Sequence, residues 1–201
     1  YGMPAPYSTR QEIFIDFLAV NDYIASGLWQ IILTGSRVVD GRYDLWLPGG
    51  GVLNSGTGFT RPSAQATMTI PATASRVITI GAYDARTFTY AEFSGRGPAD
   101  ENTFWETAKP DVVAPGVAVR SVATGGGYAE YTGTSFAVPF VTGSAALLME
   151  WGIIKGNDPY LYGEKLKAYL IRGARKLPGE AEYPNERVGY GALCLERSFP
   201  L

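Results

Sequence analysis

The sequence predicts an α/β fold in which a β-rich segment precedes a parallel sheet covered by helices. Residues 76–83 form a continuous apolar stretch, as expected of a strand buried on both faces of a parallel sheet. Residues 136–149 are apolar apart from small hydroxyls, which is typical of a buried helix. Residues 1–70 contain short β-type segments separated by Gly, Pro and Asp-Gly turns, a pattern that favours an all-β module.

Composition narrows the classes of protein that the chain can represent. Its 201 residues, 46% hydrophobic and 18% charged, predict a globular protein with a sizeable core. The net charge of -2 predicts attraction neither to nucleic acid nor to a membrane. We expect no membrane span, because Pro139 and Gly143 interrupt the longest apolar run. A single cysteine, Cys194, excludes an internal disulfide.

The first 70 residues read as a series of strands. Alternating or apolar-rich segments bounded by turn residues predict strands at 11–19, 27–35 and 67–70, and a hairpin at 38–48 around Asp40-Gly41. Two aromatic residues here, Trp29 and Trp46, have two interpretations. They form either a stacking platform for a carbohydrate or part of the module's core.

Further elements follow residue 76. Residues 117–122 are predicted as a strand, and 125–127 as a glycine turn. A helix is expected from Asn157-Asp158-Pro159, with Asp158 as its N-cap and with Lys165 and Lys167 on its solvated side. We expect Asp111 to accept hydrogen bonds from nearby backbone N–H groups.

The strongest functional signal is the turn Gly133-Thr134-Ser135, which opens the apolar helix. The first N–H groups of a helix have no partner within it, and the positive end of the helix dipole lies there. A serine at this position is therefore either an N-cap or a nucleophile whose developing negative charge the helix end stabilises.

The spacing of this segment resembles the serine signature of the subtilisin-like peptidases. The matching positions are Gly133, Thr134, Ser135, Ala137, Pro139, Val141, Gly143, Ala145, Ala146 and Leu147. Three further segments resemble family loops and strands in the same order, at 91–98, 109–116 and 189–193. The resemblance covers about residues 70–197 and implies the C-terminal portion of a subtilisin-like parallel-sheet domain. It also implies that the Ile70–Pro71 bond is cis.

This resemblance implies a serine endopeptidase that acts on a peptide or protein. Ser135 would attack the carbonyl, while Gly133 and Thr134 shape the turn that holds the oxyanion. The family's aspartate and histidine precede its serine, but this chain has no histidine and no Asp-Thr/Ser-Gly turn. The chain is therefore either part of a longer peptidase, whose missing N-terminal part is its partner, or a degenerate pseudo-peptidase that binds or signals. We expect no cofactor or metal, because no Asp/Asn cluster has calcium-ligand spacing.

Residues 1–70 resemble part of the jelly-roll insert of the Csp germination proteases of clostridial spores, and more faintly the P domain of proprotein convertases. The Gly-Leu-Trp segment at 27–29 and the segment 40–48 carry this likeness. It implies a division into a partial β module, 1–70, and a peptidase portion, 71–201. It also implies an extracellular or spore-associated location.

Overall fold

The computed structural model describes residues 12–38, 41, 43–49, 52–98 and 108–200, and the chain forms two compact units. The first unit is Tyr1–Ser55 and the second is Gly56–Leu201, so the division precedes the predicted boundary at 70/71. Residues 56–70 belong with the second unit because hydrogen bonds hold them there. The amide of Ala66 donates to Gly97 O, and the amide of Thr67 donates to Arg96 O, each at 3.0 Å.

The strands predicted in the N-terminal segment do not form within its described residues. Residues 12–19, 27–35, 43–48 and 67–70 make no ladder, and an isolated bridge pairs Val20 with Tyr23. Asp40, in the predicted hairpin turn, lies outside the described residues. A strand needs the backbone of a neighbour to satisfy its N–H and C=O groups, and alternation alone does not supply one. Trp29 and Trp46 are 57% and 62% exposed, so neither is a core residue here.

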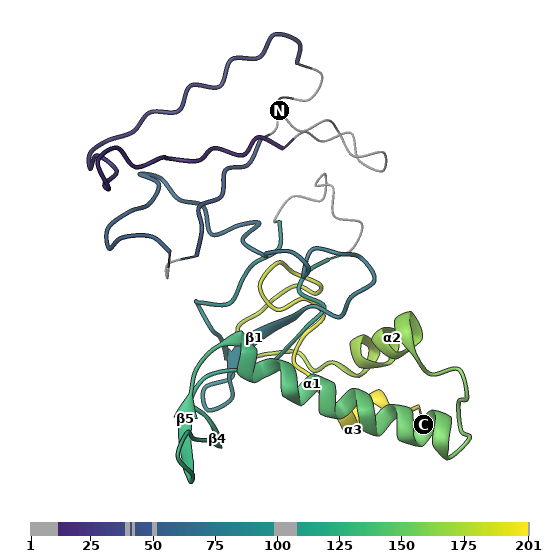
Figure 1. Ribbon diagram of the computed structural model, residues 1–201. Coiled ribbons are helices and arrows are strands. Elements are labelled where there is room, and N and C mark those ends of the chain that lie inside the picture. The colour runs from purple at the N-terminus through teal and green to yellow at the C-terminus, as the bar shows by residue number, and fades with distance from the viewer. Residues whose placement is uncertain (1–11, 39–40, 42, 50–51, 99–107, 201) are drawn as a thin grey trace. The chain divides into compact units, whose positions relative to one another are not determined.

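The second unit is built on a three-stranded sheet in the order β2-β1-β3 (Figure 1). Strand β1 (Ile80–Asp84) pairs in parallel with β3 (Val112–Pro115) and antiparallel with β2 (Thr89–Tyr90). The parallel strand predicted at 76–83 is confirmed, although it begins at Ile80. The Ile70–Pro71 bond that precedes it is cis, as the resemblance implied.

Alternate residues of the sheet face two hydrophobic clusters. On one face, Ala82, Val112 and Ala114 pack with the helices. On the other face, Tyr83 and Val113 pack with the C-terminal part of the chain, through Leu177, Val188 and Ala192. Because successive strand residues point to opposite faces, a short apolar strand contributes to both clusters. This arrangement explains why β1 and β3 have no polar side chain at their centres.

The other elements lie around this sheet. The hairpin of β4 (Val119–Val122) and β5 (Tyr128–Tyr131) confirms the predicted strand and glycine turn. Helix α1 (Thr134–Met149) packs on β1 and β3 and continues without a break into the π-helical turn η1 (Glu150–Ile154). Helix α2 (Gly163–Gly173) contacts α1 and the short α3 (Leu195–Ser198).

The composition of helix α1 predicted burial on all sides, and this prediction is wrong. The helix is buried along one face only. Its buried residues are Ala137, Val141, Ser144 and Leu148. Apolar side chains on the rest of its surface remain open to solvent: Val138, Phe140 and Leu147 are 42%, 43% and 50% exposed. The sheet of this unit can cover only one side of the helix, so an apolar face is left without a partner among the described residues.

The expectation that no segment is long enough to span a membrane is wrong by length and composition. Pro139 and Gly143 do not interrupt the helix, and Thr134–Ile154 forms 21 continuous helical residues with a mean hydropathy of 1.5. The core helix of a soluble protein passes the same test. One face of α1 is buried against the sheet, as in a core helix.

Asp158 is not the cap of α2, which begins at Gly163. Its carboxylate instead accepts hydrogen bonds from the Lys165 ammonium at 2.6 Å and from the Tyr169 hydroxyl at 2.8 Å. These bonds hold the pKa of Asp158 below its usual value, with that from Lys165 contributing most. The residue therefore ties the loop before α2 to the helix rather than starting it.

A buried ionic cluster joins β3 to α2 and to the segment before β1. Lys109 and Asp111 are 2% and 1% exposed, and the Lys109 ammonium lies 3.0 Å from Asp111 Oδ2. Lys167, predicted on the solvated side of its helix, is 8% exposed and lies 2.7 Å from Asp111 Oδ1. Asp111 also accepts the Thr79 amide at 2.6 Å, a partner distant in sequence rather than a local one. The carboxylate thus balances one of two buried positive charges.

Backbone carbonyls compensate for the second charge. Lys167 donates to Ser75 O and Val77 O at 3.0 Å each, and Lys109 donates to Val77 O at 3.1 Å. Lys109 also donates to the Thr79 hydroxyl at 2.8 Å. Each ammonium therefore has oxygen acceptors for its three hydrogens. Burial still lowers the pKa of Lys109, because desolvation outweighs its bond to Asp111.

The cluster predicts a large difference between two lysines of the same helix. Replacing Lys167 by Met should lower the free energy of unfolding by about 2 kcal/mol or more, because Asp111 Oδ1 loses its buried partner and Ser75 O loses its donor, although Val77 O keeps the bond from Lys109. Lys165→Met removes an ion pair whose lysine side chain is 47% exposed, and Tyr169 still donates to Asp158, so this change should lower the unfolding midpoint much less. Urea unfolding of both variants measures the difference, and equal midpoints would contradict this role for the cluster.

Candidate functional site

The serine turn lies between strand β5 and helix α1, and its N-cap is Gly133 rather than Ser135. Gly133 has a φ of 155° and a ψ of 157°, a conformation that L side chains rarely adopt. Thr134 is the first helical residue and Ser135 the second. The interpretation of Ser135 as an N-cap is therefore wrong, since the capping position belongs to a residue without a side chain.

Two backbone contacts and one aromatic stack fix this turn. The Gly133 amide donates to Gly116 O at 2.8 Å, and the Ala118 amide donates to the Thr132 hydroxyl at 3.0 Å. The rings of Tyr131 and Phe136 stack with centroids 5.0 Å apart and planes at 13°. The end of β5 and the first turn of α1 are thereby held in one arrangement on either side of Ser135.

Gly116 connects the turn to the sheet. Its amide donates to Tyr83 O at 3.1 Å, at the end of β1, while its carbonyl accepts from Gly133. A Cβ on Gly116 would lie 2.6 Å from the Cβ of Ala82 and 3.1 Å from Gly133 O. Only glycine allows this approach, so the carboxyl ends of β1 and β3 position the start of α1 through a contact between two backbones.

Ser135 is exposed to solvent at the start of α1. Among the residues that the structure describes, its hydroxyl has no hydrogen-bond partner. The first N–H groups of α1 have no acceptor four residues earlier in the chain, so those of Thr134 and Ser135 are available to an oxyanion. The arrangement offers a nucleophile and an anion-stabilising helix end, but the chain has no histidine to accept the serine proton.

Comparison with known proteins identifies the family. The model of the subtilase family, Peptidase_S8, matches residues 54–191, which is more than half of the chain. The chain belongs to the subtilase family. Its fold is accordingly part of a subtilisin-like α/β domain, as the serine signature and the order of the other motifs predicted.

Individual subtilases align with the same part of the chain. Serine protease AprX of Bacillus subtilis is 32% identical over 163 residues, and the match covers 71% of this chain and 34% of AprX. Human membrane-bound transcription factor site-1 protease is 33% identical over 141 residues, and the match covers 67% of this chain and 12% of that protein. The structure of the Clostridium perfringens CspB protease superposes with a TM-score of 0.68 at 48% identity. It covers 73% of this chain and 30% of CspB.

The chain thus spans about a third of the length of AprX and of CspB. The subtilase signature pointed to Gly133, Thr134 and Ser135, and the structure brings these residues together at an exposed helix end. Sequence reasoning missed the part played by Gly116 and Thr132. The resemblance of 109–116 to a family segment was a signal for Gly116. The close approach of Gly116 to Ala82, however, is a property of the packed sheet.

Two glycines of this subtilase unit should respond in opposite directions to the same substitution. Gly116→Ala should lower the free energy of unfolding by about 1–3 kcal/mol, because its Cβ meets Ala82 and Gly133 at distances that require a backbone shift. Gly143 lies in α1, where an added Cβ meets nothing within 4 Å. Gly143→Ala should therefore raise the free energy of unfolding by about 0.5–1 kcal/mol.

Denaturant unfolding, combined with amide exchange at Gly133, measures both effects. A stable Gly116→Ala variant with unchanged protection of the Gly133 amide would show that the close approach does not hold the turn.

Proposed function

We propose that the chain is the serine-bearing portion of a subtilisin-like serine endopeptidase, with Ser135 as the nucleophile. The observation that carries this proposal is the exposed position of Ser135 at the free N-terminus of α1 in a subtilase fold. A buried or capping serine would have argued against it. Gly133 supplies the backbone conformation that presents the serine, and Thr134 completes the turn.

In the proposed reaction, Ser135 Oγ attacks the carbonyl carbon of a peptide bond, and the C–N bond breaks to give an acyl-enzyme and an amine that takes up the proton lost by the serine. Water then hydrolyses the acyl-enzyme and releases the acid product. The serine proton passes to a histidine, which must come from outside these 201 residues because none occurs here. The Ser135 N–H stabilises the oxyanion, and loss of one such donor typically costs about 10²–10³ in rate. The substrate class is a peptide or protein.

A second candidate function is a pseudo-peptidase that binds a partner without cleaving it. The absence of histidine from the sequence favours this alternative. The serine turn favours the peptidase, because it presents Ser135 to solvent at the N-terminus of α1, where free N–H groups can stabilise an oxyanion.

An active-site probe separates these functions. The isolated chain should not react with a fluorophosphonate, because no base activates Ser135. The complete protein should be labelled stoichiometrically, and Ser135→Ala should abolish the labelling. Thr142→Ala, which removes another exposed hydroxyl of α1, should leave it intact. Intact mass and peptide mapping give the readout; failure of the complete protein to react favours the pseudo-peptidase.

We also propose that a preceding part of the same protein covers the exposed side of α1. Val138, Phe140 and Leu147 are too exposed for an isolated core helix, and the chain spans only about a third of AprX and of CspB. The same missing part would supply the catalytic aspartate and histidine. We propose further that residues 1–70 belong to a jelly-roll-like insert whose remaining strands lie in that part, because the N-terminal segment has strand-like patterning but its described residues form no ladder.

Complementation tests the covering of α1. When the preceding part is co-expressed with this chain, it should co-purify with it and restore fluorophosphonate labelling. Phe140→Asp should prevent both the co-purification and the labelling, because it places a charge in the proposed interface between α1 and the preceding part. Val122→Asp serves as the control, since Val122 is 73% exposed on the β4–β5 hairpin. Equal behaviour of the two variants would argue that the face of α1 has another role.

A further inference from the structure

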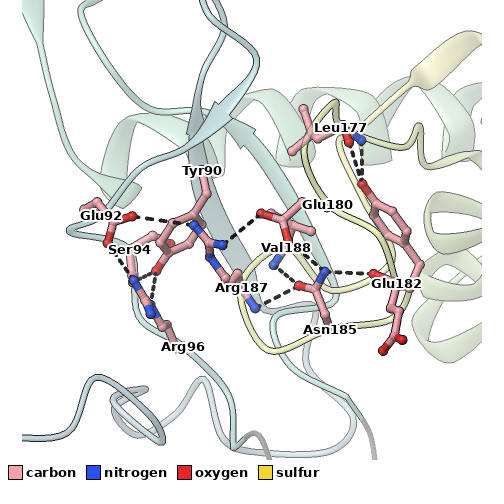
Figure 2. A network of polar contacts seen from close by, with 11 residues as sticks. Tyr90, Glu92, Ser94, Arg96, Leu177, Glu180, Glu182, Asn185, Arg187 and Val188 are labelled. Atoms are coloured by element: carbon pink, nitrogen blue, oxygen red, sulfur yellow. Dashed lines mark hydrogen bonds and ion pairs between the residues drawn. The ribbon is translucent and has the colours of Figure 1, made fainter.

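Two arginines converge on one tyrosine ring (Figure 2). Tyr90, on β2, is 7% exposed, and the guanidinium carbons of Arg96 and Arg187 lie 5.1 and 4.9 Å from its ring centroid. Arg96 Nε also donates to the Tyr90 hydroxyl at 3.3 Å, and that hydroxyl donates to Ser94 O. The ring therefore orients both guanidinium groups, which lowers the entropy that each loses on binding an anion.

Asn185 fixes the loop that carries Arg187. Its side-chain oxygen accepts the amides of Arg187 and Val188 at 3.0 and 2.9 Å, while its amide nitrogen donates to Glu180 Oε2 and Glu182 O at 3.2 and 2.8 Å. Figure 2 shows this arrangement beside the Tyr90 ring. Arg187 is consequently held by its backbone as well as by its ring contact.

One carboxylate, that of Glu92, bridges the two arginines. Its Oε2 lies 2.6 Å from Arg96 Nη2, and its Oε1 lies 3.6 Å from Arg187 Nη2. The side chains differ in exposure: Arg96 is 19% and Arg187 is 35% exposed, but Glu92 is 74% exposed. The cations are thus fixed and largely covered, whereas the anion is a solvent-facing side chain whose ion pairs contribute little free energy.

A hollow of about 300 Å³ opens beside this pair. Glu92 and Arg96 form part of its lining, and Phe93, which is 50% exposed, forms another part. An exposed aromatic ring next to an oriented arginine is a combination that is enriched in protein interfaces. The hollow therefore offers an apolar contact for the body of a ligand whose carboxylate reaches Arg96 in its lining. Arg187 lies outside that lining and shares the Tyr90 ring and Glu92 with Arg96.

We propose that Arg96 and Arg187 form a site for a peptide carboxylate and that Glu92 occupies it as an intramolecular stand-in. With Glu92 displaced, Arg96 and Arg187 are opposed by Glu180, which lies 3.5 Å from Arg187, and these groups carry one net positive charge. Glu186 acts on Arg96 from farther away and weakens the attraction. Affinity is therefore modest, and Glu92 competes with any ligand as a tethered anion at an effective concentration in the millimolar range.

Removal of the internal competitor tests the site in the 201-residue chain. The probes are an acetylated and amidated Gly-Glu-Gly peptide, its Gly-Gln-Gly counterpart, and acetyl-Gly-Gly-Gly with a free C-terminus. Glu92→Gln should bind a carboxylate peptide about fivefold more tightly than wild type, as measured by NMR titration. Glu164→Gln is the matched control, because Glu164 is an exposed carboxylate paired with another arginine, Arg76. It should bind as wild type does.

Further arms separate the sources of the carboxylate and the role of charge. Tighter binding of the glutamyl peptide identifies an acidic side chain as the ligand, and tighter binding of the third peptide identifies a C-terminus. Adding Arg187→Gln to Glu92→Gln should abolish the gain, and raising the salt concentration should weaken it. The proposal is overturned if Glu92→Gln binds no more tightly than Glu164→Gln, or if the glutaminyl peptide binds equally well. None of these outcomes depends on Ser135, so the test is independent of the proposed peptidase activity.

Discussion

The contact between the backbones of Gly116 and Gly133 is the constraint on which the arrangement of this unit depends. The turn after β3 must approach both β1 and the start of α1, and a side chain at Gly116 would occupy the space of Ala82. This approach lets one short parallel sheet determine where a helix begins. The position of Ser135 is therefore set by the sheet, and the helix adds its free N–H groups and dipole to a point already fixed.

The same unit leaves part of its apolar surface exposed to solvent. Each face of its sheet is covered, and the residues of β1 and β3 are divided between two clusters. Helix α1, by contrast, buries one face and leaves apolar side chains on the other, and the N-terminal segment exposes most of its large apolar side chains. Burial of such surface is the main favourable term in folding, so a chain with this pattern gains stability from a partner that covers it.

Charged groups are treated differently in the interior and at the surface. Lys109, Asp111 and Lys167 are buried, and three oxygen acceptors surround each ammonium, so loss of Asp111 would leave two buried positive charges without a counter-charge. Around Tyr90, the arginines are held by a ring and by a loop, while Glu92 remains in solvent. The first arrangement stabilises one conformation. The arrangement around Tyr90 leaves the Glu92 carboxylate in solvent, where a carboxylate of another molecule can replace it at little cost in free energy.

The sequence by itself determined the family, the parallel strand before the serine turn, the strand at 117–122 with the glycine turn after it, and the identity of the candidate nucleophile. Each of these features depends on local spacing or on a short apolar run, and both can be recognised within a single segment of the sequence. Only the tertiary structure decided that Gly133 rather than Ser135 caps α1, that Lys167 is buried and that the predicted N-terminal strands do not pair within the described part of the chain. Each of these outcomes depends on which distant backbone lies opposite a residue: Gly116 opposite Gly133, Ser75 and Val77 opposite Lys167, and no described strand beside residues 27–35. Periodicity reports the face of a residue but not what that face meets, and for this reason a lysine in a polar position and a strand with good alternation were both misread.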